Sequence, residues 1–366
     1  MIQPLRIAQA VPPIERVPPD GYGGTERVVY DLVRELGRRG HDITTFASGD
    51  SRVPGRLVET VPMALRPAGH GGEVGGFMLA TTLQVLDLAS KFDIIHSHLE
   101  WYSLLLRRAT SVPIVATFHG RLDVPWSSAA LADRPAGMVA ISESQASVHP
   151  DVPWTVVHNG LDLDDAPFEH RRDDDLVFVG RVTPEKGIVE AIEIAQRAGR
   201  HLRIAAKIGP TPPEQDFYTA VFQPALNAAG PAVEFLGEVS GAERDDLVAR
   251  SYALLMPGSW PEPFGLVAIE SLACGTPVLA REVGGLREII RDGIDGFFGD
   301  DAMELAFLVD RVGELDRAAI RASVIDRFSA SRMADGYEAV YARMLGLGSD
   351  DGNGDRVVEL DAARAR

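Results

Sequence analysis

The sequence predicts two α/β domains, each built on a parallel β-sheet with helices on both faces. Short apolar runs alternate with amphipathic segments along almost the whole chain, which is typical of β–α–β units. The chain has 366 residues, too long for one ordinary domain of this class and long enough for two. A charge-dense, apolar-poor stretch at 162–175 interrupts the alternation, which restarts after it. We therefore expect an acidic linker between two similar halves.

The first half begins with a buried strand followed by an amphipathic helix. Leu5–Ala10 is the predicted strand and Glu26–Arg39 the predicted helix. Apolar residues of that helix recur at i, i+3, i+4 and i+7 from Val29 to Leu36, and Gly40 follows as its stop. Further strands are predicted at Ile43–Ala47, Asp93–Ser97, Ile114–Phe118, Met138–Ile141 and Thr155–His158.

The second half repeats this pattern. Its strands are predicted at Leu176–Val179, Leu202–Ala206, Val233–Leu236, Ala253–Met256 and Val278–Ala280. Helices are predicted from Lys186, through Ala220, from Gly241, from Phe264 and over Ala330–Leu345. The stretch 52–76 contains GHGGEVGG and has no clear period, so we expect a loop there.

Composition and charge exclude several classes of protein. Hydrophobic residues make up 45% of the chain and charged residues 24%, so a sizeable core is available. The formal net charge of −17 would repel a phosphate backbone, which argues against nucleic-acid binding. Cys274 is the only cysteine, so neither an intrachain disulfide nor a cysteine-based zinc site is expected. With no basic leader and no apolar run of about 18 residues, we expect a cytoplasmic protein without a transmembrane segment.

Ligands of open parallel sheets bind beyond the carboxyl ends of the strands, and this rule selects four loops. The first, 18–25, joins the first strand to the first helix. Gly23 and Gly24 lack a Cβ, so their backbone can approach a ligand closely, and the helix start favours an anion. The dinucleotide fingerprint G-x-G-x-x-G is absent, because Glu26 stands where its third glycine would be. A glycine-rich turn without a ligand is an equally good interpretation of this loop alone.

The second loop carries two cations after the first strand of the second half. Arg181 and Lys186 lie in FVGRVTPEKG, where an arginine fork and a lysine point charge could clamp a diphosphate. Solvated surface cations are the ordinary alternative. In a chain of net charge −17, however, two cations at a strand end favour an anion site.

The third loop, GSWPEPFGLVAIESLACG, leads into an apolar helix. The free amides at the helix start, Phe264–Leu266, suit a phosphate. Glu262 precedes the helix and could accept hydrogen bonds from sugar hydroxyls. Glu270 lies about six residues, or about 9 Å along the axis, beyond the amides at the helix start, which resembles the span from a diphosphate to a ribose. Two solvated glutamates are the alternative, but Glu270 sits on a helix that is apolar nearly all round and needs a partner.

The fourth loop carries His119, directly after the strand Ile114–Phe118. A histidine at this position can donate to a ligand, and a satisfied structural histidine is the alternative. For His96 and His98 we favour the structural interpretation. The sequence contains no H-E-x-x-H, G-x-S-x-G or P-loop motif. It therefore lacks the residues that a metallohydrolase, a serine hydrolase or a P-loop NTPase would need.

Together these segments resemble the retaining glycosyltransferases of family 4, whose GT-B fold has two doubly wound Rossmann-like domains facing a central cleft. The resemblance runs from about Leu5 to Leu345. Its most specific part is the E-x7-E motif, Glu262–Glu270, followed by ACGTPVLAREVGGLREII. The N-terminal GG loop, the HNGLD segment at His158–Asp162 and GRVTPEKG match as well.

The resemblance implies a division of the chain. An N-terminal Rossmann-like, acceptor-binding domain would span 1–161, the linker 162–175, and a C-terminal nucleotide-sugar-binding domain 176–329. A crossover helix over 330–347 would pack back onto the N-terminal domain, and 348–366 would form a disordered tail.

The resemblance also implies roles for single residues. Arg181 and Lys186 would hold the donor diphosphate, Glu270 the ribose and Glu262 the donor sugar, while His119 would lie beside the transferred centre. The implied catalytic residues are His119, Glu262, Arg181 and Lys186. The implied donor-binding residues are Gly23, Gly24, Arg181, Lys186, Glu238, Val239, Glu262, Phe264, Gly265, Leu266 and Glu270.

The implied reaction moves a sugar from a nucleotide-diphosphate sugar to an acceptor hydroxyl with retention of configuration, without a metal or another cofactor. UDP-glucose is the favoured donor, from its frequency in the family. The acceptor and the oligomeric state stay open, and an acceptor at a membrane surface is compatible with the sequence. The alternatives are a non-hydrolysing nucleotide-sugar epimerase on the same fold, a pyridine-nucleotide oxidoreductase and a non-catalytic nucleotide-sugar-binding protein.

Overall fold

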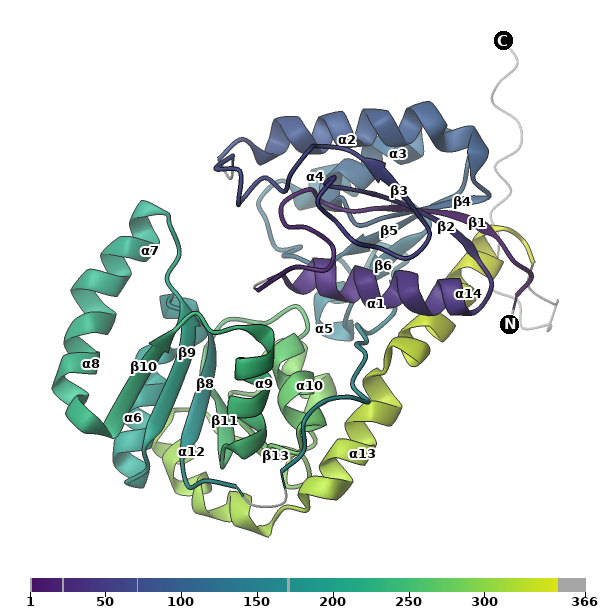
Figure 1. Cartoon of the computed structure of the whole chain (residues 1–366). Coiled ribbons are helices and arrows are strands. Elements are labelled where there is room, and N and C mark those ends of the chain that lie inside the picture. Colours follow the sequence, from purple (N-terminus) through teal and green to yellow (C-terminus); the bar gives the residue numbers. More distant parts are fainter. Residues whose placement is uncertain (1, 22, 71, 170–171, 348–366) are drawn as a thin grey trace.

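Two lobes, each built on a parallel β-sheet, make up the fold (Figure 1). This computed structural model describes residues 2–21, 23–70, 72–169 and 172–347. The predicted tail at 348–366 therefore lies outside the described residues. The doubly wound α/β fold that the sequence predicts is confirmed in both halves of the chain.

Within the described residues, the first lobe contains a seven-stranded sheet in the order β3-β2-β1-β4-β5-β6-β7, with every strand pair parallel. The strands are β1 (Arg6–Ala10), β2 (Asp42–Ala47), β3 (Arg56–Glu59), β4 (Ile94–Ser97), β5 (Ile114–Phe118), β6 (Met138–Ala140) and β7 (Thr155–Val156). The first strand lies inside the sheet, and the chain builds outward from it on both sides. The connections after β1 and β4 therefore diverge, which leaves a crevice for a ligand at their carboxyl ends.

Helices cover both faces of this sheet (Figure 1). They are α1 (Gly24–Arg38), α2 (Val74–Leu88), α3 (Ser103–Ala109), α4 (Ser127–Ala130) and α5 (Glu143–Ala146). Helix α1 forms because its apolar residues share one face, and Val29, Leu32, Val33 and Leu36 on that face are fully buried. This face packs on the sheet, so the glycine-rich start of α1 is fixed at the carboxyl end of β1.

The second lobe repeats the arrangement. Among the described residues its sheet has six strands in the order β10-β9-β8-β11-β12-β13, again parallel throughout. The strands are β8 (Leu176–Arg181), β9 (Leu202–Lys207), β10 (Val233–Gly237), β11 (Ala253–Met256), β12 (Val278–Ala280) and β13 (Gly296–Phe298). The connection after β8 leads to β9 on one side and the connection after β11 leads to β12 on the other, which makes a second crevice at the carboxyl ends of these strands.

The helices of the second lobe also lie on both sides of their sheet (Figure 1). They are α6 (Ile188–Ala198), α7 (Pro212–Phe217), α8 (Gln223–Ala229), α9 (Gly241–Arg250), α10 (Leu266–Ala273), α11 (Leu286–Ile289), α12 (Ala302–Leu308) and α13 (Arg317–Phe328). The last helix, α14 (Ala330–Met344), follows α13 but leaves this lobe. The helix predicted through Ala220 is a short α-helix, α7, that continues as a π-helix over Tyr218–Phe222. The helix predicted from Phe264 begins two residues later, at Leu266.

The prediction of a loop over 52–76 is wrong for part of the stretch. Residues Arg56–Glu59 form β3, the edge strand of the first sheet, and α2 begins at Val74. The edge strand is only half-buried and carries charges at both ends, so it lacks the apolar run of an inner strand. The start of α2 contains Gly75 and Gly76. Because glycine has a low helix propensity, the sequence did not predict a helix there.

The chain crosses between the lobes twice, and the two crossings lie side by side. The backbone amide of Leu161 donates to the carbonyl of Phe328 at 3.1 Å, and the amide of Ala330 donates to the carbonyl of Leu161 at 2.9 Å. A Cβ on Gly160 would lie 2.3 Å from the carbonyl oxygen of Ser329, so only glycine permits this approach. The lobes are thus connected by two adjacent segments of the chain that are hydrogen-bonded to each other.

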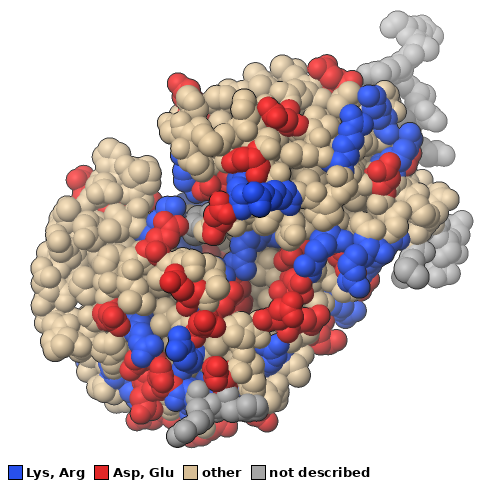
Figure 2. All heavy atoms as spheres, viewed as in Figure 1, with Lys and Arg blue, Asp and Glu red and all other residues tan. Residues whose placement is uncertain are grey.

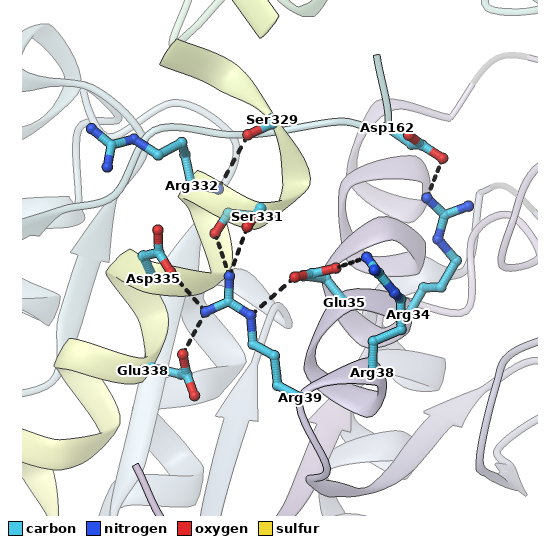
Figure 3. Close-up of polar contacts among 10 residues, drawn as sticks. All are labelled: Arg34, Glu35, Arg38, Arg39, Asp162, Ser329, Ser331, Arg332, Asp335 and Glu338. Carbon is cyan, nitrogen blue, oxygen red and sulfur yellow. Dashed lines mark hydrogen bonds and ion pairs between the residues drawn. The ribbon is translucent and has the colours of Figure 1, made fainter. Parts of the chain in front are cut away.

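Beyond the second crossing, helix α14 returns to the first lobe and packs against α1 (Figure 3). Arg39 anchors the contact: its guanidinium pairs with Glu35 of its own helix and with Asp335 and Glu338 of α14. It also donates to the carbonyl and hydroxyl oxygens of Ser331, at 2.8 and 2.9 Å. The C-terminal helix therefore crosses back to the N-terminal domain, as the sequence predicts.

Candidate functional site

The carboxyl ends of both sheets border one pocket between the lobes, with a cavity volume of about 430 Å³. A hollow between the two lobes is visible on the surface in Figure 2. All residues that the resemblance implies in donor binding or catalysis line this pocket. They are Gly23, Gly24 and His119 from the first lobe, and Arg181, Lys186, Glu238, Val239, Glu262, Phe264, Gly265, Leu266 and Glu270 from the second.

The glycine loop brings the two lobes together at the start of α1. Gly24 is the first residue of this helix, and a Cβ there would lie 3.0 Å from Cδ1 of Leu266 on α10. Gly23 is equally confined, since its Cβ would lie 2.8 Å from Cβ of Pro19. The N-termini of α1 and α10 thus meet at the pocket, and both offer unpaired amides that suit an anion.

Lys186 reaches the pocket because its loop packs on the loop after β11. Gly187 has a φ of +72°, and a Cβ on it would lie 2.6 Å from the amide nitrogen of Gly258. Glycine is therefore required at this close contact. The contact places the Lys186 ammonium against the carboxylate of Glu262, with which it forms an ion pair.

Arg181, at the end of β8, is also paired with carboxylates. Its guanidinium lies 3.3 Å from an oxygen of Glu185 and 3.4 Å from an oxygen of Glu214. Sequence reasoning identified the two cations but missed these partners. Both predicted phosphate-binding cations are thus neutralised by glutamates that an incoming anion would have to displace.

Glu270 lies on α10 with a side chain that is 11% exposed. Its buried position was expected to need a partner, and the structure provides two arginines. Arg27 of α1 forms an ion pair with it across the cleft, and Arg244 of α9 lies 3.8 Å away. The start of α10 is fixed by Gly265, whose φ is +124° and whose Cβ would lie 2.6 Å from Leu286.

His119 sits in the pocket wall of the first lobe, just after β5. Its backbone amide and that of Gly120 both donate to one oxygen of Glu100, at 3.0 and 3.1 Å. Burial lowers the pKa of the His119 imidazole to about 4, so the ring is neutral at pH 7. Its Nε2 lies 2.9 Å from Nδ1 of His98, which is fully buried together with His96.

The far end of the pocket, beside β9 and β10, contains Glu238 and Val239. The Glu238 carboxylate lies 3.2 Å from the ammonium of Lys207. A Cβ on Gly21 would lie 3.3 Å from the same carboxylate, so the N-terminal loop covers this end. Lys207 was not anticipated from the sequence, because a lysine that ends a strand is usually solvated.

A further group of charged residues lines the first lobe's side of the pocket. Arg66 forms an ion pair with Glu15, and Glu26 lies beside them with only 5% of its surface exposed. Burial, the largest effect, raises the pKa of Glu26 to about 7. Arg66 belongs to the stretch 52–76, to which the sequence assigned no role.

The charges in the pocket differ from those of the whole chain. Among the described residues that line it, six are arginine or lysine and six are glutamate, whereas the chain has 36 basic and 53 acidic residues. The pocket is thus rich in cations on an acidic protein. Cations and helix-terminal amides suit phosphates, and carboxylates suit sugar hydroxyls, so the pocket fits a molecule that carries both.

Two general features of the described residues bear on function. In this part of the chain, no group of three or more His, Cys, Asp or Glu side chains is placed to hold a metal ion. None of the helices in the same part is long and apolar enough to cross a membrane.

Known proteins resemble this chain along most of its length. Residues 22–165 match Glycosyltransferase Family 4, and residues 163–319 match Glycosyl transferases group 1. The D-inositol 3-phosphate glycosyltransferase of Mycobacterium leprae is 30% identical over 394 residues, covering 88% of this chain and 89% of that protein. The glycogen synthase of Mycobacterium tuberculosis is 29% identical over 336 residues, covering 76% of this chain and 79% of that protein.

The fold has the same relatives. The structure of sucrose-phosphate synthase from Thermosynechococcus elongatus superposes with a TM-score of 0.72 at 21% identity, covering 94% of this chain and all of that one (100%). These likenesses confirm the GT-B fold and the enzyme class, and they do not favour an epimerase, an oxidoreductase or a non-catalytic binding protein. The chain belongs to glycosyltransferase family 4.

Proposed function

We propose that this enzyme transfers a hexose from a nucleoside-diphosphate sugar, of the UDP-glucose type, to an acceptor hydroxyl with retention of configuration. The observation that carries the proposal is the pocket itself. It joins two cations and two helix N-termini, which suit a diphosphate, to two glutamates, which suit sugar hydroxyls. In this proposal residues 176–329 bind the nucleotide sugar and residues 1–161 the acceptor.

Donor binding would exchange partners within the pocket. A diphosphate between Arg181 and Lys186 would take the place of the carboxylates that now neutralise them. Glu262 would then be free to accept hydrogen bonds from the sugar. Glu270, which now pairs with Arg27 and Arg244, would accept from the ribose hydroxyls with one of its oxygens.

The chemical step would depend on stabilising the leaving group. The bond between the sugar C1 and the diphosphate oxygen breaks, and the charge that develops on that oxygen is offset by Arg181, Lys186 and the amides of Phe264–Leu266. The acceptor oxygen attacks C1 from the face that the diphosphate leaves, and the acceptor proton passes to the departing phosphate. The products are a nucleoside diphosphate and a glycoside of unchanged configuration.

The proposal is tested by product analysis. The donors are UDP-, GDP- and ADP-glucose. The acceptors include inositol 3-phosphate and glycogen, because these two compounds appear in the names of the two relatives above. Proton NMR of the fresh product should show the anomeric configuration of the donor. An inverted centre would refute retention.

Metal independence is tested in the same assay. Because Arg181 and Lys186 would offset the diphosphate charge in this proposal, we expect transfer to persist in excess chelator. Loss of transfer with chelator, restored by a divalent cation, would show that the cations of the chain do not suffice.

A further inference from the structure

A chain of buried hydrogen bonds leads from His119 in the pocket to the crossover helix α14. Nε2 of His119 lies 2.9 Å from Nδ1 of His98, and Nε2 of His98 lies 2.9 Å from Oε1 of Gln9. Nε2 of Gln9 donates to the hydroxyl of Tyr341 at 3.4 Å. This path of hydrogen bonds thus connects β1, the ends of β4 and β5, and helix α14.

The path continues beyond Tyr341 within the core. The Tyr341 hydroxyl lies 2.8 Å from Nδ1 of His96, and Nε2 of His96 lies 2.8 Å from Oγ1 of Thr117. The hydroxyl of Tyr337 closes the path, 3.1 Å from the same Thr117 oxygen. The members with no exposed surface are Gln9, His96, His98, Thr117, Tyr337 and Tyr341.

The histidines in this path are neutral, because burial lowers the pKa of His119 to about 4 and those of His96 and His98 well below their usual value. Each ring therefore carries one proton, on one of its two nitrogens. In a row of such rings every hydrogen bond can be made with all protons pointing one way along the row or all pointing the other way. One group that can only donate, or only accept, at a given atom therefore fixes the direction of every proton in the row.

Gln9 is the group that fixes the direction of the protons in this path. Its Oε1 can only accept, so Nε2 of His98 must carry the proton of that ring. Nδ1 of His98 is then a lone pair, and it can only accept from an Nε2–H of His119. Nδ1 of His119 is left as a lone pair, and among the described residues it has no hydrogen-bond partner. The reverse pattern would require the amide of Gln9 to face the other way.

We infer that Gln9, His98 and Tyr341 are positioning residues that hold His119 in its Nε2–H tautomer, so that His119 presents an acceptor to the pocket. The inference rests on the proposed function for its ligand, a hydroxyl of the donor sugar. That hydroxyl must donate to Nδ1 of His119. A donor sugar with a carboxylate or carbonyl at the same place would set its oxygen against the bare Nδ1 of His119. Neither atom can donate a hydrogen bond, so such a donor is rejected.

Tyr341 holds the side-chain amide of Gln9 in the orientation described above. Its hydroxyl accepts from Nε2 of Gln9 and, with Nδ1 of His96 unprotonated, donates to that ring. Without this hydroxyl the amide of Gln9 is free to turn, and both tautomers of His119 become accessible. Because Tyr341 belongs to α14, the helix that follows the second crossing also sets the hydrogen-bonding character of the pocket wall.

The first test measures the tautomer directly. Two-bond nitrogen–proton NMR correlations of histidine-labelled, ligand-free protein at neutral pH report which ring nitrogen is protonated, and His119→Gln identifies the His119 signals. We expect Nε2 protonated and Nδ1 bare. A ring protonated at Nδ1, or at both nitrogens, would overturn the inference. This readout needs no transferase activity, so it stands apart from the proposed function.

Matched variants test the positioning roles. Tyr341→Phe removes the hydroxyl that holds Gln9, and Tyr337→Phe removes the same group one turn away, at the other end of the path. The His119 signals should shift toward a mixture of tautomers in the first variant and stay unchanged in the second. Gln9→Met, which keeps the side-chain length without the amide, should act as Tyr341→Phe does. An unchanged tautomer in both Tyr341→Phe and Gln9→Met would refute the positioning role.

Donor analogues test the consequence for specificity. One sugar hydroxyl at a time is replaced by hydrogen or by fluorine, which can accept but not donate. At the position that meets His119, both replacements should lower kcat/KM by a similar factor, about 10- to 100-fold. A fluorinated donor that matches the natural one while the deoxy donor fails would show that His119 donates. If no nucleotide sugar is consumed but the tautomer is as expected, the proposed function fails and the positioning inference stands.

Discussion

Lys186 is a single residue that links the fold to the proposed chemistry. The close contact of Gly187 with Gly258 brings its ammonium to Glu262, so the lysine is held in the pocket before any donor arrives. Preorganised charge of this kind stabilises a leaving group without further rearrangement of the cation. Its ion pair is partly exposed, with the lysine side chain 24% accessible, so it adds little to stability.

Lys186→Ala should therefore reduce turnover much more than stability. We expect kcat/KM to fall by about 100-fold or more, whereas the melting temperature changes by only about 2–4 °C. The control is Lys91→Ala, which removes an exposed lysine outside the pocket and should leave both quantities as in the wild type. Normal turnover in Lys186→Ala would remove this residue from the proposed phosphate clamp.

Glu26 predicts a pH dependence of stability. Burial raises its pKa to about 7 in the folded protein from an ordinary value of 4.5, so the folded state binds this proton more tightly than the unfolded state. The resulting stabilisation is fully present below pH 4.5 and is lost as the pH rises through about 7.

Glu26→Gln removes this dependence. Relative to wild type, the variant should gain free energy of unfolding between pH 5 and pH 8, by up to about 3 kcal/mol. Thermal unfolding at the two pH values measures the gain, with Glu234→Gln, an exposed glutamate, as the control. If the difference between variant and wild type is the same at both pH values, Glu26 does not titrate in this range.

At the scale of residues, the sequence identified the members of the pocket but not their partners. Arg181, Lys186 and Glu262 could be found because each lies in or beside a loop at a strand's carboxyl end. Glu270 could be found because it is a carboxylate on a helix that is otherwise apolar. Arg27 could not be found as the partner of Glu270, because that contact depends on how the two lobes face each other. The histidine path was invisible for the same reason, since its members are separated by up to 332 positions.

At the scale of the described elements, every inner strand could be predicted, whereas only two of the four edge strands, β7 and β10, could be. β5 and β11 have the predicted bounds, because a strand buried on both faces is a continuous apolar run. β3 and β13 were missed: the first is a half-buried edge strand, and the second has three residues and begins with glycine. Hydrophobic pattern thus predicts the centre of each sheet better than its borders.

The contact of α1 with α14 gives a prediction at this scale (Figure 3). Arg39 is 11% exposed and pairs with three carboxylates, so Arg39→Ala removes a guanidinium that two buried carboxylates, Glu35 and Glu338, share. We expect a loss of about 3 kcal/mol in the free energy of unfolding of the first lobe, measured by urea titration. The neighbouring Arg38, which is 74% exposed and pairs only with Glu35, is the matched control. Arg38→Ala should cost less than about 1 kcal/mol, and equal losses in the two variants would contradict this account.

At the scale of the whole molecule, two crevices face each other because two similar lobes are joined by a double crossing beside Gly160. Neither lobe alone completes the pocket: the first supplies Gly24, Arg27 and His119, and the second supplies Arg181, Lys186, Glu262 and Glu270. The lobes also meet through Glu288, which accepts from the amides of Glu143 and Ser144 and pairs with His158. The site is therefore a property of the assembled chain rather than of either sheet.

In the proposed function, this cleft binds a nucleoside-diphosphate sugar through Glu270, Arg181 and Lys186. The most direct test is the release of nucleoside diphosphate from UDP-, GDP- and ADP-glucose without an acceptor, together with calorimetric binding of each donor. Wild type and the control Glu193→Ala, an exposed glutamate on α6, should bind and slowly hydrolyse one of the three, and Glu270→Ala should lose both activities. Equal release by Glu270→Ala, or neither release nor binding with any donor, would contradict the account.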